Sequence, residues 1–398
     1  MQLSQEILDL VEKYTFLPLS EVALKLQKFP IATRTMVLDQ IHGGQKAKTK
    51  LPSYFQQKEI IYPPKLNLEQ CSSEQTATFK AGLVSGKSLV DLTGGFGVDS
   101  WAFSKRFEEV CYVEQNESLV DIVNHNFEKL KSHNIQIYKD NAQHFLENFT
   151  KTVDWIYLDP ARRDSQNKAV AQIKETEPNV IELMTLMFQK AENILLKTSP
   201  MFDIGQAIEH LSFVKKVWVV SLENECKEVL YWLKKDCNEY QDIEIEAVNI
   251  LSNQKNDILK GTKLKEETVT ITYSEPQKYI YEPNASIMKA GFFKTVAQIF
   301  DLSKLHPNTH IYTSDILKKD FQGRIFEMIK VFQGNTAMKE LQTYLPDKKA
   351  NIAVRNYPLS VEQIRKQTKI QEGGEEWILG VTLHNESRVL ILAKRILI

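Results

Sequence analysis

The stretch that decides the fold is Ser88-Leu-Val-Asp-Leu-Thr-Gly-Gly-Phe-Gly97. Its apolar half predicts a strand, and its glycines predict a tight turn before a helix, where the backbone can approach a ligand closely. Glu114 ends the next predicted strand, where nucleotide-binding α/β folds place an acid that binds ribose hydroxyls. A glycine-rich turn alone is weak evidence, but the strand, turn, helix, strand and acid together indicate a nucleotide site.

Outward from this stretch, short apolar runs alternate with helical patterns. Strands are predicted at 88–92, 110–114, 135–138, 155–158, 194–197 and 217–221, with further strand-like runs at 243–250 and 268–273. Strands that alternate with helices indicate a mostly parallel sheet covered on both faces. The predicted fold class is therefore α/β with a Rossmann-like domain.

The chain has 398 residues, which is too long for one ordinary core, so several domains are expected. Residues 1–70 predict a helical N-terminal module that contains a basic loop at 43–50 and ends in an extended linker. We expect the α/β domain at 71–275 and a small separate segment at 276–320. The last part, 321–398, predicts a small α+β domain. Its strands are expected at 321–326, 350–355, 377–384 and 389–393, and its helix at 360–367.

Composition limits the possible partners. Lys and Arg number 50 against 51 Asp and Glu, so any contact with nucleic acid must come from local basic patches. The candidate basic residues, which could equally be ordinary solvated surface, are Lys46, Lys48 and Lys50, and then Arg355, Arg365, Lys366 and Lys369.

The cysteines and the apolar runs limit the class of protein further. The four cysteines form no C-x-x-C pair, so we expect neither a disulfide framework nor a metal site. The N-terminus lacks the pattern of a signal peptide, and no apolar run is long enough to span a membrane. A cytoplasmic protein without membrane contact is expected.

Polar residues frame the predicted nucleotide site. Asp140 and Asn141 follow the third strand, and Asp140 is interpreted either as a partner of an adenine amino group or as the N-cap of the next helix. Ser72, with Gln75 three residues later, predicts a capping box before the first sheet strand. Ser100 occupies the third glycine position of a dinucleotide fingerprint, which weakens an NAD interpretation.

The fourth predicted strand runs into Asp159-Pro-Ala-Arg-Arg163. Ligands of open α/β sheets bind outside the carboxyl ends of the strands. Asp159, or the rigid turn at Pro160, can therefore position a substrate amine. Arg162 and Arg163 can hold a phosphate or a carboxylate bidentately, or they can form structural ion pairs.

The residues described so far resemble those of a known enzyme class. Asp91-x-Thr-Gly-Gly-x-Gly97, Glu114, Asp140 and Asp159-Pro-Ala-Arg162 stand in the order and spacing of class I S-adenosylmethionine-dependent methyltransferases. Ser72-Ser73-Glu74 is similar to a segment of RNA cap guanine-N2 methyltransferases. The whole chain resembles a bacterial methyltransferase family with a ferredoxin-like segment and a THUMP-like C-terminal domain. The stretches that carry this resemblance are 68–74, 159–163 and 281–291.

The resemblance implies S-adenosylmethionine as the cofactor. Asp91, Thr93, Gly94, Gly95 and Gly97 would form the cofactor loop. Glu114 would bind the ribose, Asp140 and Asn141 would flank the adenine, and Asp159, Pro160 and Arg162 would form the catalytic segment. One departure concerns Ala161-Arg162, which replaces the aromatic residue on which amino-group methyltransferases stack a base.

The resemblance also implies the acceptor. THUMP-like domains dock structured RNA, so methyl transfer to a base nitrogen of tRNA or rRNA is expected. Direct displacement is favoured over covalent catalysis, because Cys226 lacks a Pro-Cys context and Cys111 lies within a strand. Two alternatives are a small-molecule or protein methyltransferase and a non-catalytic RNA adaptor that binds the same cofactor.

Overall fold

The computed structural model describes residues 3–162, 173–237, 242–252, 255–334, 336–345 and 347–397. The chain divides into two compact units. The first comprises Met1–Lys216 and Val229–Glu239, and the second comprises Val217–Glu228 and Tyr240–Ile398. No helix in the described part of the chain is both long and apolar enough to cross a membrane.

The first unit begins with five helices. They are α1 (Gln5–Tyr14), α2 (Leu19–Lys25), α3 (Ile31–Lys50), α4 (Pro52–Gln56) and α5 (Lys65–Gln70). The first three share a small apolar core around Val22, Leu26 and Val37. This cluster forms because apolar residues recur at helical spacing along all three helices.

The prediction of a loop at 43–50 is wrong, because these residues form the second half of α3. Gly43 faces Tyr62, and a Cβ there would lie 2.2 Å from the Tyr62 Cβ. The glycine is therefore needed for close packing of the helix and does not break it. Ala47 is fully buried on the same helix, which gives α3 an apolar contact beyond the glycines.

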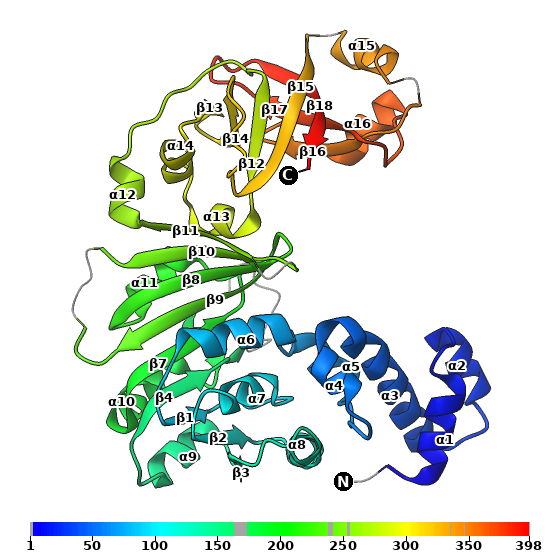
Figure 1. Ribbon diagram of the computed structural model, residues 1–398, viewed down its shortest axis with the longest axis vertical. Helices are drawn as coiled ribbons and strands as arrows, with labels where there is room; N and C mark the ends of the chain where they lie inside the picture. The colour runs from blue at the N-terminus through cyan, green and yellow to red at the C-terminus, as the bar shows by residue number, and fades with distance from the viewer. Residues whose placement is uncertain are drawn as a thin grey trace. The chain divides into compact units, whose positions relative to one another are not determined.

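An α/β domain follows in the same unit, and it confirms the predicted fold class. Its strands β7 (Ala191–Thr198), β4 (Val153–Leu158), β1 (Ser88–Asp91), β2 (Glu109–Glu114) and β3 (Ile135–Lys139) lie in that order and are parallel. Figure 1 shows α6 and α7 on one face of these strands and α9 and α10 on the other. The helices of this part are α6 (Glu74–Leu83), α7 (Val98–Ser104), α8 (Glu117–Lys129), α9 (Ala142–Asn148), α10 (Val180–Lys190) and α11 (Ile204–His210).

Three short elements and one long strand complete this part. The short elements are β5 (Ala161–Arg162), a 3-10 turn (Ile173–Glu175) and β6 (Thr176–Glu177). The long strand β9 (Glu225–Lys234), of which residues 229–234 belong to this unit, pairs antiparallel with β7 and was not predicted. Its polar first half hides the strand pattern, although residues 228–231 are buried.

The second unit contains β8 (Val214–Leu222) in larger part, β10 (Glu244–Ile250), β11 (Asn256–Thr262) and a separate sheet. The order of that sheet is β13-β14-β12-β15-β18-β17-β16. Its strands are β12 (Tyr279–Pro283), β13 (Ser303–His306), β14 (Thr309–Ser314), β15 (Gly323–Gln333), β16 (Asn351–Arg355), β17 (Glu376–Thr382) and β18 (Arg388–Ile396). The helices are α12 (Lys263–Thr268), α13 (Ala285–Ala290), α14 (Thr295–Phe300), α15 (Ala337–Thr343) and α16 (Val361–Thr368).

The prediction of a strand at 268–273, in this unit, is wrong. Thr268 ends α12, whose first turn is capped by the Thr262 hydroxyl, and Tyr273 makes only an isolated bridge with Lys304. The charged run between Lys263 and Thr268 favours a solvated helix over a strand. The strands predicted from residue 321 onward are found as β15 to β18.

Candidate functional site

A cavity of about 590 Å³ opens at the carboxyl edge of the parallel strands in the first unit. This edge is where open α/β sheets bind ligands, because the loops that leave the strands diverge there. Loops after β1, β2, β3 and β4 line it together with α5 and the segment around Pro178. Among its lining residues are Asn67, Gln70, Cys71, Ser72, Thr93, Gly94, Gly95, Gly97, Asp99, Glu114, Asp140, Asn141, Asp159, Ala161, Glu177, Asn179 and Glu182.

The glycines of the loop after β1 have distinct structural roles. Gly95 and Gly97 have φ angles of +52° and +77°, which residues other than glycine rarely adopt. A Cβ on Gly94 would lie 2.2 Å from the Tyr112 ring, whose hydroxyl donates to the Gly95 carbonyl at 2.7 Å. The loop is therefore held against β2, and its backbone forms one wall of the cavity.

Asp91 lies beneath this loop and does not line the cavity. Its carboxylate accepts hydrogen bonds from the Thr93 N–H at 3.0 Å and from the Ser100 hydroxyl at 2.5 Å. Burial raises the pKa of Asp91 to about 7, although both hydrogen bonds act in the opposite direction. Asp91 thus shapes the loop, and Ser100 stands at the third glycine position as its hydrogen-bond donor.

The three polar residues predicted after β2 and β3 do line the cavity. The Glu114 carboxylate accepts from the Gly95 N–H at 3.0 Å and from the Asn116 N–H at 2.8 Å. Asn141 caps α9, because its side chain accepts from the His144 N–H at 2.9 Å. The N-cap of this helix, for which Asp140 was one interpretation, is therefore Asn141. Asp140 instead contacts the His144 ring at 2.7 Å.

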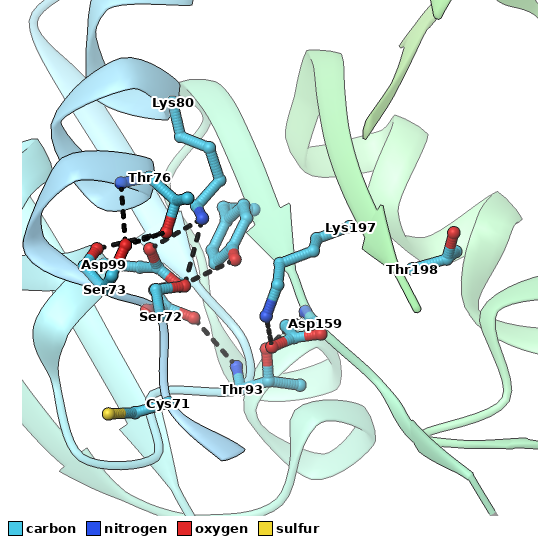
Figure 2. A network of polar contacts seen from close by, with 12 residues as sticks. Cys71, Ser72, Ser73, Thr76, Lys80, Thr93, Asp99, Asp159, Lys197 and Thr198 are labelled. Atoms are coloured by element: carbon cyan, nitrogen blue, oxygen red, sulfur yellow. Dashed lines mark hydrogen bonds and ion pairs between the residues drawn. The ribbon is translucent and has the colours of Figure 1, made fainter. Parts of the chain in front are cut away.

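Asp159 lies at the end of β4 with both its backbone and its carboxylate held. Its N–H donates to the Thr93 hydroxyl at 2.6 Å, and its Oδ2 forms an ion pair with the Lys197 ammonium (Figure 2). Pro160 is buried and does not line the cavity. Arg162 pairs through its backbone with Thr176 in a short hairpin. The Arg162 side chain and Arg163 lie outside the described part of the chain.

A buried polar network lies beside Asp159 and is drawn in Figure 2. The Ser72 hydroxyl and the Tyr157 hydroxyl each donate to Asp99 Oδ2 at 2.8 Å. Lys80 Nζ donates to the Ser72 hydroxyl at 3.0 Å and lies 3.2 Å from Asp99 Oδ1. The capping box predicted at Ser72 is therefore wrong: Ser73 caps α6, which leaves the Ser72 hydroxyl for this network.

Opposing effects set the ionisation of Asp99. Burial raises the pKa of its carboxyl, but the Lys80 and Lys197 ammonium groups and the hydrogen bonds from Ser72 and Tyr157 outweigh burial and lower it. Asp99 is thus a charged carboxylate in the folded chain. Two lysines that no sequence motif indicated, Lys80 and Lys197, supply the positive charge.

The described lining of the cavity is acidic. It carries carboxylates from Asp99, Glu114, Asp140, Asp159, Glu177 and Glu182, and it contains no lysine, arginine or histidine. Within the described residues, no group of three or more His, Cys, Asp and Glu side chains is arranged to hold a metal ion. A cavity of this charge favours a cationic ligand and disfavours a diphosphate.

The predicted basic patches are smaller than the sequence indicated. Lys46 and Lys48 are exposed on α3, but the Lys50 ammonium donates to the Leu68 carbonyl at 2.8 Å. In the second unit, Arg355 forms an ion pair with Glu282 at 2.6 Å, and Arg365 donates to the Ile370 carbonyl at 3.1 Å. Structural contacts therefore engage Lys50, Arg355 and Arg365.

The chain is similar over 99% of its length to the crystal structure of a candidate methyltransferase from Porphyromonas gingivalis W83, of which it covers 100%, with 31% sequence identity and a TM-score of 0.87. Three segments match sequence families. Residues 74–204 match the family described as conserved hypothetical protein 95, residues 279–321 a ferredoxin-like domain, and residues 323–395 a THUMP domain-like family.

Two further solved structures match only part of the chain. A candidate RNA methyltransferase from Pyrococcus horikoshii is 18% identical, with 43% of this chain and 91% of that chain covered and a TM-score of 0.32. M. capricolum TrmK, in complex with S-adenosylhomocysteine, is 13% identical over 40% of this chain and 68% of that chain, also with a TM-score of 0.32. Neither match carries a conclusion about activity. No curated protein sequence matches the chain.

Proposed function

We propose that this chain, which belongs to the class I S-adenosylmethionine-dependent methyltransferase family that includes the Porphyromonas gingivalis protein, methylates a base nitrogen of structured RNA. The observation that carries the cofactor assignment is the acidic lining of the cavity beside the glycine loop. S-adenosylmethionine is a sulfonium cation with an ammonium group, so negative charge in the cavity stabilises it. The diphosphate of NAD would be repelled there.

The residues of the cavity fit this cofactor. The positive φ of Gly95 and Gly97 brings the backbone close to the cavity, and the Glu114 carboxylate has capacity to accept from two ribose hydroxyls. We assign the ribose to Glu114 and the adenine to the cavity wall at Asp140 and Asn141. When bound, the cofactor supplies an electrophilic methyl group that needs no further activation.

Asp159 is the residue that we assign to the acceptor. Its carboxylate lines the cavity and can accept a hydrogen bond from an amino group, which orients the nitrogen lone pair toward the methyl group. A transfer to this nitrogen would break the sulfur–carbon bond of the cofactor as the nitrogen–carbon bond forms, and the nitrogen would lose one proton to solvent. Ala161 offers no ring for stacking, so the base must be held by other groups.

Support for an RNA acceptor comes from the second unit. Residues 323–395 match a THUMP domain-like family, and domains of this type dock structured RNA. Lys46 and Lys48 add exposed positive charge on α3 of the first unit. The THUMP-like domain supports a tRNA or rRNA acceptor, and the acidic cavity supports the cofactor assignment.

The proposal is tested with methyl-labelled S-adenosylmethionine and total RNA from a strain that lacks the gene. We expect one labelled nucleoside, identified by mass spectrometry, with the wild-type chain and none with Asp159→Ala. Calorimetry should show that both proteins bind S-adenosylmethionine and that neither binds NAD. Label found only in protein or metabolites would contradict the RNA acceptor. Cofactor binding without any transfer would favour the adaptor alternative.

A further inference from the structure

Lys197 is a buried cation beside the proposed acceptor site. It lies near the end of β7, which pairs with β4 so that Leu196 stands opposite Leu158. This register places Lys197 beside Asp159 at the cavity edge. The Lys197 side chain is only 11% exposed, whereas the Asp159 side chain is 32% exposed. The cation is therefore behind the cavity wall, and its carboxylate partner is part of that wall.

The contacts of Asp159 leave one oxygen for a ligand. The Thr93 hydroxyl fixes its backbone N–H, and the Lys197 ammonium fixes Oδ2. Among the contacts of the described residues, Oδ1 accepts no hydrogen bond from protein. Figure 2 shows Lys197 and Thr93 on either side of the carboxylate. An ionised carboxylate in one orientation is what an N–H donor of the acceptor requires.

The charge of Lys197 also matters because the cavity is crowded with acids. Six carboxylates line it, and Asp99 is close enough for Lys197 to lower the pKa of its carboxyl. Without Lys197, the Asp159 carboxylate would lose the contact that fixes its Oδ2. The carboxylate could then rotate, and neither of its oxygens would be held toward the acceptor.

We propose that Lys197 is a positioning residue for methyl transfer, which holds Oδ2 of Asp159 so that Oδ1 stays directed at the acceptor nitrogen. This inference rests on the proposed role of Asp159 in holding the acceptor. It assigns Lys197 no contact with substrate. The competing view is that Lys197 only fills space in the core, which Lys197→Met would preserve and Lys197→Arg would disturb.

The first test does not depend on activity. Full-length protein with ¹³C-labelled aspartate carboxyls is studied by NMR at about pH 7 in the presence of S-adenosylhomocysteine, and Asp159→Asn identifies the Asp159 signal. In Lys197→Met the chemical shift of the Asp159 carboxyl should differ from that of the wild type, because the ammonium contact at Oδ2 is lost. Lys197→Arg should restore the wild-type signal. Identical Asp159 signals in wild type and Lys197→Met would overturn the inference, whatever the acceptor proves to be.

The second test reads the reaction itself on total RNA under single-turnover conditions. Lys197→Met should slow transfer by about 10- to 100-fold, the loss expected for one charge-assisted contact, and Lys197→Arg should recover most of the rate. The affinity for S-adenosylmethionine should remain within about threefold, since the lysine acts on the acceptor side. Lys190→Met, which removes a lysine that donates to the Phe149 carbonyl away from the cavity, is the control and should leave the rate unchanged.

A double variant separates the two proposals. If Lys197 acts only through Asp159, then Asp159→Asn with Lys197→Met should be no slower than Asp159→Asn alone. Additive effects would contradict a role through Asp159. Failure of the wild-type chain to methylate RNA would refute the proposed function, and the NMR comparison would still decide whether Lys197 holds the Asp159 carboxylate.

Discussion

The side-chain amide of Asn126 exchanges two hydrogen bonds with the backbone of Ile61. Its Oδ1 accepts from the Ile61 N–H at 2.9 Å, and its Nδ2 donates to the Ile61 carbonyl at 2.8 Å. The Gln40 amide makes the same pair of contacts with Tyr62, both at 2.9 Å. The segment predicted as an extended linker is thus held between α3 and α8, just before α5 reaches the cavity.

Replacing Asn126 with alanine should therefore destabilise the first unit. The buried N–H and carbonyl of Ile61 would lose their partners, at about 1–3 kcal/mol for each group left unpaired. We expect Asn126→Ala to lower the free energy of unfolding by about 2–4 kcal/mol in urea denaturation. Asn148→Ala, which removes an exposed amide from α9, is the control and should change it by less than about 0.5 kcal/mol. Equal effects of the two variants would show that the hydrogen bonds between Asn126 and Ile61 do not stabilise the fold.

The glycines after β1 should respond differently to alanine. At Gly97 a Cβ would lie 2.7 Å from the Phe127 ring, so Gly97→Ala should cost stability, about 2 kcal/mol or more. At Gly95 the nearest atom would be 3.7 Å away, so Gly95→Ala should cost only about 1 kcal/mol for its positive φ. Because Gly95 lines the cavity, Gly95→Ala should nevertheless weaken S-adenosylmethionine binding about tenfold by calorimetry, an order-of-magnitude estimate for a poorly placed methyl group.

Gly82→Ala provides the control for that comparison. Gly82 lies in α6 with nothing within 4 Å of an added Cβ, so alanine should leave cofactor affinity unchanged and slightly raise stability. If Gly95→Ala binds the cofactor as well as Gly82→Ala does, the loop is not part of the cofactor site.

Asp91 should make stability depend on pH. Burial raises the pKa of its carboxyl from 3.8 to about 7 in the folded chain. Between these values the folded state holds a proton that the unfolded state releases, so stability falls as pH rises through this window and stays lower above it. Asp91→Asn removes this titration. Its stability relative to wild type should therefore improve by about 2 kcal/mol from pH 5 to pH 8, measured by urea denaturation. A difference that stays constant with pH would contradict the assignment.

The sequence was sufficient to predict the central strands and several of the residues that line the cavity. β1, β2 and β4 are apolar runs buried on both faces, and the residues that leave them must gather at one edge of a parallel sheet. This is why Glu114 and Asp159 could be placed in advance. Local patterns failed where packing decides the outcome. Gly43 sits inside a helix because Tyr62 needs the space.

The lysines behind the cavity could not be predicted for a related reason. Lys80 and Lys197 belong to a helix and to a strand whose patterns explain them as ordinary residues, and their partners, Asp99 and Asp159, are distant in sequence. Only the fold brings each pair together. Asp91 is the opposite case. The sequence motif indicated it as a residue of the cofactor loop, but only the structure shows that it is buried beneath that loop.

Lys80 gives the sharpest test of the buried network. Its side chain is fully buried and ion-paired with Asp99, so Lys80→Met should lower the free energy of unfolding by about 3–5 kcal/mol at pH 7 by leaving that carboxylate without its nearest cation. Because the folded pKa of Asp99 lies below 3.8, its charge stabilises the fold above that pH, and this contribution is lost as pH falls through the folded value. The cost of Lys80→Met should therefore shrink in acid. Asp99→Asn in the Lys80→Met background should restore much of the stability at pH 7, since a neutral amide can still bond with Ser72 and Tyr157. A double variant as unstable as the sum of its parts would show that the two residues do not act as a pair.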